Sequence, residues 1–122
     1  MYFDEDMMLD LRLNILDKYV SHFIICEATF NHKGLKKKLN FDIKNLQRNY
    51  LMNKIKDFED DDLININDID EIPNFEKFTY KKKITIFKQK MIYYKFNLVH
   101  PKLTWMGSKI CKKKHLHSPQ WI

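Results

Sequence analysis

The spacing of apolar residues predicts a helix at the start of the chain. Between Asp4 and Tyr19, Leu9, Leu13 and Leu16 recur at intervals of four and three residues with polar residues among them, which is the period of an amphipathic helix. Acidic residues gather in the first turn, with Asp4 as a candidate N-cap, where the positive end of the helix dipole favours them.

Three further patterns follow this helix. His22–Cys26 is an apolar run of strand length with no helical period, which predicts a parallel strand buried on both faces. Asp42–Phe58 returns to helical spacing and predicts a second helix. Leu63–Asn67 alternates as a strand and delivers the acidic segment Asp68–Glu71 at its end, after which Pro73 predicts a turn.

The last third of the chain predicts a short helix and three strands. The helix is expected at Phe75–Tyr80, and the strands at Ile84–Phe87, Met91–Phe96 and Trp105–Ile110. Helices and strands alternate first and further strands come last, an order typical of an α/β fold.

Length and composition narrow the class of protein. At 122 residues and 15.0 kDa the chain is expected to form one domain, residues 1–122. Hydrophobic residues make up 44% and charged residues 31%, which argues against wholesale disorder. No apolar run approaches the roughly 20 residues of a membrane-spanning helix, and no signal peptide is expected. Cys26 and Cys111 stand far apart and are expected to be free thiols.

Charge is divided unevenly along the chain. The net charge is +6, yet all 16 acidic residues lie at or before Glu76, and only lysines carry charge after it. A basic half of this kind can present phosphate contacts to nucleic acid, or it can be an anion-binding half beside a metal-binding half. All basic residues except Arg12 and Arg48 are lysines, the bias of an AT-rich genome, so part of the lysine excess is compositional.

Asp68 and Asp70 form the sharpest chemical feature. Two carboxylates two residues apart in an extended or turning segment can converge on one hard cation through oxygen ligands. In open α/β sheets the ligand crevice lies outside the carboxyl ends of the strands, where Glu27 and the Asp68–Glu71 segment both fall. A solvated acidic loop is the alternative for the same residues.

Five sequence blocks, in order and across nearly the whole chain, resemble glycosyltransferase family 17, the β-1,4-mannosyl-glycoprotein 4-β-N-acetylglucosaminyltransferases. The blocks are Phe3–Leu16, Phe23–Phe30 with Gly34 and Lys36 behind it, Gln47–Asn49, Asp60–Pro73, and Trp105–Ile110 together with Ser118–Gln120. The fourth block resembles the family's acidic turn, strand and Asp-x-Asp-Glu-Ile-Pro signature, with Asn67 where the family usually has Ser.

The resemblance implies a partial nucleotide-diphospho-sugar transferase (GT-A-like) sheet with flanking helices. It also implies an inverting, metal-dependent transfer of N-acetylglucosamine from UDP-N-acetylglucosamine to the β-linked mannose of N-glycans. The partners would be a nucleotide-sugar donor and a glycan acceptor. The animal members of the family are Golgi membrane proteins, whereas the location of this chain is left open.

Site residues also follow from the resemblance. Asp70, with Asp68 directly or through water, would hold Mn²⁺ or another divalent cation, which would stabilise charge on the departing UDP. Donor contacts would come from Glu27, Asp68 and Glu71. For Glu27 a structural hydrogen bond to its loop is the alternative, and for Glu71 the alternative is capping of the helix after Pro73.

Compared with the family, the chain is expected to be a shortened member or fragment. It is expected to be incomplete at both ends, with an internal deletion between Phe41 and Gln47. An inverting transfer needs a general base, usually a carboxylate, and none follows Glu76. The catalytic base is therefore left unassigned, with His100, His115 and His117 as imperfect substitutes, and transfer by this chain is expected to be absent or very slow.

The remaining features predict structural roles. Trp105 is expected to pack in the core, and the runs Lys81–Lys83 and Lys112–Lys114 are expected to face water. Arg48 is expected to pair with a carboxylate near the strand ends. The rival function is a non-catalytic module whose basic half, with aromatic residues among its lysines, binds RNA or DNA.

Overall fold

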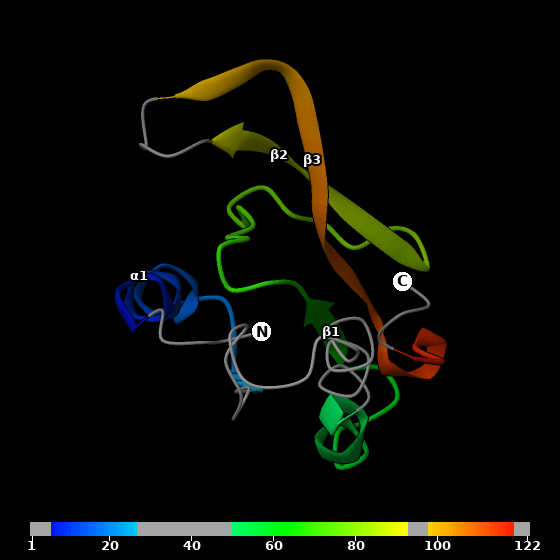
Figure 1. Cartoon of the computed structure of the whole chain (residues 1–122). Coiled ribbons are helices and arrows are strands. Elements are labelled where there is room, and N and C mark those ends of the chain that lie inside the picture. Colours follow the sequence, from blue (N-terminus) through cyan, green and yellow to red (C-terminus); the bar gives the residue numbers. More distant parts are fainter. Residues whose placement is uncertain (1–5, 27–49, 93–97, 119–122) are drawn as a thin grey trace, which may run out of the picture.

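The chain forms a small mixed α/β structure (Figure 1). The computed structural model describes residues 6–26, 50–92 and 98–118. Its elements are α1 (Asp6–Leu16), β1 (Leu63–Ile66), β2 (Ile84–Ile92), β3 (Val99–Lys112) and the 3₁₀ turn η1 (Lys113–His115). Residues 50–55 form a further short helix.

The helix predicted at the start of the chain is confirmed. α1 spans Asp6–Leu16, residues 17–19 form a turn, and Leu16, one of the three periodic leucines, is only 1% exposed. The second helix, predicted for Asp42–Phe58, is present at residues 50–55, while residues 42–49 lie outside the described part. Asp4, the expected N-cap, also lies outside it.

The described sheet is antiparallel, so the predicted parallel pairing is wrong for these strands. The strand order is β1-β3-β2, and β3 pairs antiparallel with both neighbours. Cys111 lies at the centre, opposite Ile64 of β1 and Ile84 of β2. β2 and β3 follow one another along the chain, and a short connection between neighbouring strands permits only antiparallel pairing.

Strand positions agree with the sequence, but two boundaries do not. β1 matches the predicted Leu63–Asn67 strand. β2 continues without a break through Lys88–Lys90, which was expected to separate two strands, because exposed and half-buried residues go on alternating there. β3 contains the predicted Trp105–Ile110 strand and begins earlier, at Val99. Residues 93–96 of the predicted Met91–Phe96 strand lie outside the described part.

The apolar run His22–Cys26 is not a strand, and the prediction of a strand buried on both faces is wrong. Its residues carry no strand pairing, and Ile24 and Ile25 are 38% and 49% exposed. An apolar run gains a strand's hydrogen bonds only when a neighbouring strand is in register with it. Within the described sheet, the strand that forms main-chain hydrogen bonds with β1 is β3.

The short helix predicted at Phe75–Tyr80 is also wrong. The segment makes a turn in which the Phe78 N–H donates to the Phe75 carbonyl over 3.1 Å. Its two phenylalanine rings pack on Phe87 of β2, with ring centroids 5.4 Å away in both cases. Tertiary aromatic packing therefore fixes this segment and overrides its helical spacing.

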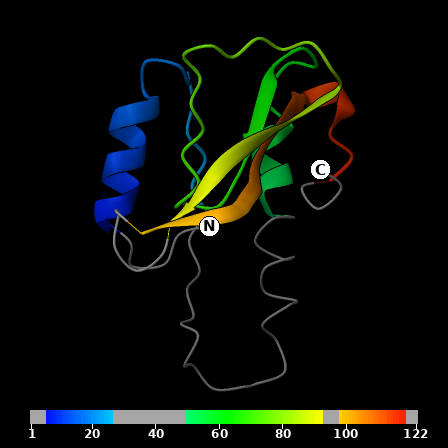
Figure 2. The same cartoon turned by 90° about the horizontal axis from the view of Figure 1, so that it is seen from above.

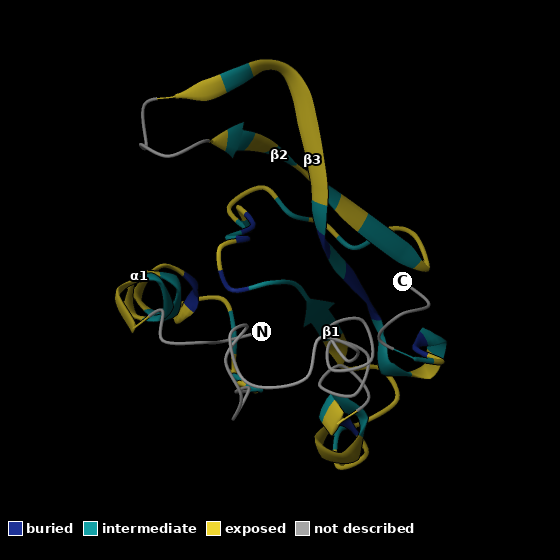
Figure 3. Cartoon of the chain, in the orientation of Figure 1, coloured by how far each residue is buried: buried dark blue, intermediate teal, exposed yellow. Residues whose placement is uncertain are grey.

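The core lies where the short helix at residues 50–55 packs against the lower half of the sheet. It is centred on Ile55, Cys111 and Leu116, with Ile64 and Ile84 among the residues around it. α1 and η1 lie on opposite sides of β1 (Figures 1 and 2). The upper part of the β2–β3 ribbon projects away from this core, and residues 101–106 of β3 are exposed (Figure 3). Among the described residues, no helix has the length and apolar character needed to span a membrane.

Candidate functional site

The candidate site is the acidic turn that follows β1. β1 ends at Ile66, and the Glu71 N–H donates to the Asp68 carbonyl over 3.1 Å, which closes residues 68–71 into a turn. The Asp68 N–H in turn donates to Glu71 Oε2 over 3.2 Å. Pro73 is fully buried two residues later. The predicted turn is therefore confirmed, and it is closed both by main chain and by a side chain.

Glu71 is a buried carboxylate with both oxygens engaged. It is 8% exposed, and Oε1 accepts a hydrogen bond of 2.6 Å from Nε1 of Trp105 on β3. No helix follows Pro73, so the alternative of a helix cap is wrong, and Glu71 closes the acidic turn instead. Trp105 is 44% exposed, so its predicted core role is also wrong.

Gly107 permits this approach of Trp105 to Glu71. A Cβ atom at position 107 would overlap both the Glu71 carboxyl group and the Trp105 indole. Only glycine leaves the required space. The neighbouring Ser108 is fully buried, and its Oγ accepts a hydrogen bond from Asn67 Nδ2 over 3.4 Å.

Arg12 reaches the same turn from α1. Its Nη1 donates to the main-chain carbonyls of Asp68 (3.2 Å) and Glu71 (2.6 Å), and its Nη2 donates to Asn67 Oδ1. The Asn67 side chain also donates to the Glu71 carbonyl over 3.3 Å, so Asn67 hydrogen-bonds the turn. Sequence reasoning missed Arg12, although one arginine of two in a lysine-rich chain was a signal.

The charged groups at the turn are the Arg12 guanidinium and the carboxylates of Asp68, Asp70 and Glu71. Burial lowers the pKa of Arg12, while the negative charges of Glu71 and Asp70 act in the opposite direction. Three carboxylates lie within residues 68–71, and the Arg12 guanidinium reaches this turn through the main-chain carbonyls of Asp68 and Glu71.

A cavity of about 660 Å³ adjoins the turn. Its walls come from α1, residues 19–26, β1 and the Phe75–Phe78 segment, and they are mostly apolar, with Arg12, Asn67 and Asp68 among the polar residues. Asn65 also lines it, and the buried Asn65 Oδ1 has no hydrogen-bond partner in the described part of the chain. A volume in the range of small-molecule pockets and a few polar groups on an apolar wall are properties of ligand sites.

The predicted site residues do not all occupy equivalent places. Asp68 is half-buried at the cavity, Asp70 is exposed, and Glu71 is buried beside Trp105. Glu27 and Arg48 lie outside the described residues. Within residues 6–26, 50–92 and 98–118, no group of three or more His, Cys, Asp or Glu side chains is arranged to hold a metal ion.

The histidines named as substitutes for the base make no such group either. His100 Nδ1 accepts the main-chain N–H groups of Lys102 and Leu103, at 3.3 and 2.8 Å, and so supports the start of β3. Cys26 and Cys111 form no disulfide within the described part of the chain, as expected.

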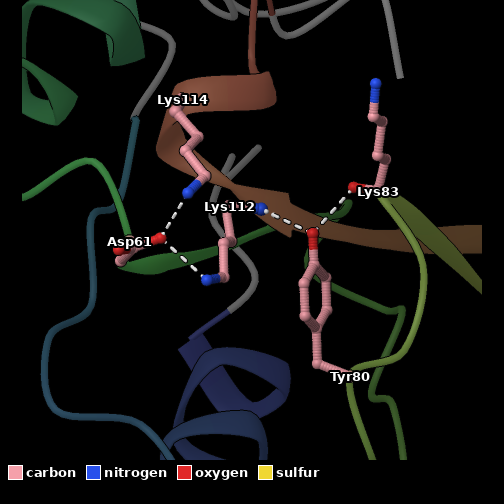
Figure 4. Close-up of polar contacts among 5 residues, drawn as sticks. All are labelled: Asp61, Tyr80, Lys83, Lys112 and Lys114. Carbon is pink, nitrogen blue, oxygen red and sulfur yellow. Dashed lines mark hydrogen bonds and ion pairs between the residues drawn. The ribbon is translucent and has the colours of Figure 1, made fainter.

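A second charged cluster joins the residues just before β1 to the end of β3 and η1, and we call it the lysine clamp: Asp60–Asp62 with Lys112–Lys114. Figure 4 shows Asp61, Lys112 and Lys114 of this cluster. Asp61 Oδ1 accepts hydrogen bonds from both Lys112 Nζ and Lys114 Nζ at 2.7 Å. These two lysines lower the pKa of Asp61 to about 2, and Asp61 raises the pKa of Lys114.

Lys113, the third lysine of the lysine clamp, bonds mainly to main-chain carbonyl groups. Its side chain is 23% exposed, and its Nζ donates to the carbonyls of Lys56 and Phe58 at the end of the short helix. Its N–H donates to the Asp62 carbonyl over 2.9 Å. The prediction that Lys112–Lys114 simply faces water is therefore wrong, whereas Lys81–Lys83 is exposed as predicted.

Comparison with known proteins adds no family to these observations. No family model matches the chain, and neither a curated protein nor a solved structure gives a significant match.

Proposed function

We propose that the chain is a member of glycosyltransferase family 17, with the partial GT-A-like fold expected above, and binds UDP-N-acetylglucosamine for transfer to a mannose of an N-glycan. The five sequence blocks motivate the family. The observation that supports the site is the doubly closed turn after β1, which places Asp68 beside the 660 Å³ cavity and Asp70 at the surface.

The residues of the turn fit a divalent cation of the Mn²⁺ or Mg²⁺ type. Such ions take hard oxygen ligands, and they are commonly held by one or two carboxylates that leave further positions for substrate phosphates and water. Asp68 and Asp70 supply carboxylates two residues apart in this turn. In this proposal they hold the cation, which supplies charge neutralisation for a diphosphate.

The other residues of the site bind or orient. The mostly apolar walls of the cavity exclude water from a bound group. Glu71 holds the turn through Trp105 and does not offer its engaged oxygens to the donor. Glu27 is proposed for a ribose or uracil contact on the basis of the sequence alone.

Titration of Mn²⁺ followed by electron paramagnetic resonance, with and without UDP, tests the proposal. Because two carboxylates bind a cation weakly without a diphosphate, UDP is expected to raise the Mn²⁺ affinity. Asp70→Ala and Asp68→Ala are expected to abolish this UDP-linked binding, whereas Asp10→Ala, an exposed acid on α1, is the matched control. Equal binding by Asp70→Ala and wild type would overturn the site.

Transfer is measured separately with radiolabelled UDP-N-acetylglucosamine and a mannose-terminated acceptor. Loss of a positioned base typically slows a reaction by about 10²–10⁴-fold, so product is expected to form very slowly or not at all. Robust Mn²⁺-dependent product would place a base within the chain.

A labelled oligonucleotide at two salt concentrations tests the rival function in the same preparation. Binding that weakens steeply with salt and survives Asp68→Ala and Asp70→Ala would favour nucleic-acid binding. The lysine clamp weighs against this outcome, because Lys112 and Lys114 are paired with Asp61 and Lys113 is bonded to main-chain carbonyls.

A further inference from the structure

We infer that Arg12 is a positioning residue for the cation site: from α1 it holds the Asp68–Glu71 turn in the shape that brings Asp68 and Asp70 to one ion. The inference rests on the proposed function, since it concerns how that site is kept ready for its ligand. Nothing in the sequence blocks assigns a role to Arg12.

The contacts of the guanidinium carry the inference first. One nitrogen of Arg12 serves the carbonyls of Asp68 and Glu71, at the two ends of the turn, and the other serves the side chain of Asn67 just before it. The guanidinium of arginine is planar and carries several N–H donors, so it can serve three acceptors that lie in two directions. A lysine ammonium at the same place is a single point charge and cannot meet all three from the helix.

Charge supports the same role. Asp68, Asp70 and the buried Glu71 lie within one turn, and like charges at this spacing repel one another. Arg12 brings a positive charge to this turn through its hydrogen bonds to the carbonyls of Asp68 and Glu71. Without the guanidinium, repulsion is expected to open the turn and to separate the two proposed ligands before any cation arrives.

The turn also has an optical reporter. Glu71 bonds the Asp68 N–H through one oxygen and the Trp105 indole N–H through the other, so a change in the turn alters the surroundings of Trp105. The only other tryptophan is Trp121. In a Trp121→Phe background, fluorescence therefore reports on Trp105 alone, with or without metal.

The experiment compares Arg12→Lys with its parent in that background. Mn²⁺ binding in the presence of UDP is measured by electron paramagnetic resonance, the emission of Trp105 is recorded without metal, and the melting temperature is measured by circular dichroism. Residues that orient metal ligands typically change affinity by about 10–100-fold when replaced. Arg12→Lys is expected to lose affinity within this range and to shift the Trp105 emission.

Two further variants separate positioning from general stability. Leu116→Ala removes a core side chain away from the turn. It is expected to lower the melting temperature at least as much as Arg12→Lys does, while Mn²⁺–UDP affinity and Trp105 emission stay unchanged. Asn67→Ala removes one acceptor of Arg12 and is expected to weaken Mn²⁺–UDP binding in the same direction by a smaller factor, which keeps the inference testable if Arg12→Lys does not fold.

The outcomes distinguish this inference from the proposed function. If wild type binds Mn²⁺–UDP and Arg12→Lys or Asn67→Ala binds it equally well, the positioning role is overturned and the proposed function stands. The role is likewise overturned if Leu116→Ala weakens binding as much as Arg12→Lys. If wild type itself does not bind Mn²⁺ with UDP, the proposed function fails, and the inference about its cation site fails with it.

Discussion

The indole of Trp105 donates a hydrogen bond of 2.6 Å to the carboxylate of Glu71, which joins β3 to the acidic turn after β1. Glu71, the acceptor, is buried, whereas Trp105 as a residue is 44% exposed. The partly exposed Trp105 thus holds the acidic turn in place through the buried side chain of Glu71.

Replacement of Glu71 by Gln is expected to destabilise the fold. Glu71 accepts one N–H from Trp105 and another from Asp68 with its two oxygens, whereas the amide of Gln has a single oxygen, so one donor faces an NH₂ group. The loss is expected to be about 1–3 kcal/mol in the free energy of unfolding, measured by urea denaturation. Glu76→Gln, at an exposed position, is the control, expected within about 0.5 kcal/mol of wild type.

Gly107→Ala is expected to break the contact between Trp105 and Glu71. The added methyl group occupies the space of the Glu71 carboxyl group and of the indole, and such overpacking typically costs about 1–3 kcal/mol. Trp105 fluorescence in a Trp121→Phe background should shift together with the melting temperature. Thr104→Ala, on the exposed part of β3, should change neither, and wild-type fluorescence in Gly107→Ala would contradict the geometry of this contact.

The lysine clamp is expected to make stability depend on acid pH through Asp61. Its pKa is lowered from 3.8 to about 2 by Lys112 and Lys114, so its stabilising contribution is complete above the ordinary value and is lost as pH falls through about 2. Melting temperatures at pH 5 and pH 2 measure the effect. Asp61→Asn is expected to lose less stability between these pH values than wild type, whereas Asp57→Asn, another exposed acid, should behave as wild type does.

Lys113 and Lys82 are expected to contribute differently to the stability of the fold, although both belong to runs of three lysines. Lys113→Met removes hydrogen bonds to the carbonyls of Lys56 and Phe58 from a side chain only 23% exposed, at an expected loss of about 1–3 kcal/mol. Lys82→Met removes an exposed charge and should stay within about 0.5 kcal/mol. Urea denaturation of both variants checks the contrast, and similar losses would show that the contacts of Lys113 do not stabilise the fold.

Local periodicity was sufficient to predict the elements that do not depend on distant partners. α1 follows from the spacing of its leucines, and β1 follows from the alternation of residues 63–67. The turn at Asp68 could also be predicted, because acidic turn residues stand just before Pro73. These signals are contained within a few neighbouring residues.

Pairing partners could not be read in the same way. Nothing within His22–Cys26 tells whether a strand will be in register beside it, and the segment is left without one in the described sheet. The helical spacing of Phe75 and Phe78 is outweighed by Phe87, which belongs to another element. Strand pairing and aromatic packing are tertiary effects, and they override local propensity.

The candidate site shows the same division. Asp68 and Asp70 carry a local signal, whereas the reach of Arg12 into the turn spans 56 residues to Asp68 and 59 to Glu71. For the lysine clamp, the sequence shows an acidic run, Asp60–Asp62, and a basic run, Lys112–Lys114, that are far apart along the chain. Only the fold shows that these two runs meet.

The length of β3 has a consequence for self-association. Residues 109–111 have partners on both sides, from β1 and β2, but the part from Val99 to Met106 pairs with β2 alone within the described sheet. Its other edge is a template on which a foreign strand can add, and exposed Leu103 and Met106 would favour such growth. Pro101 has no N–H to offer at this edge and Lys102 adds a charge, so these two residues act as gatekeepers against aggregation.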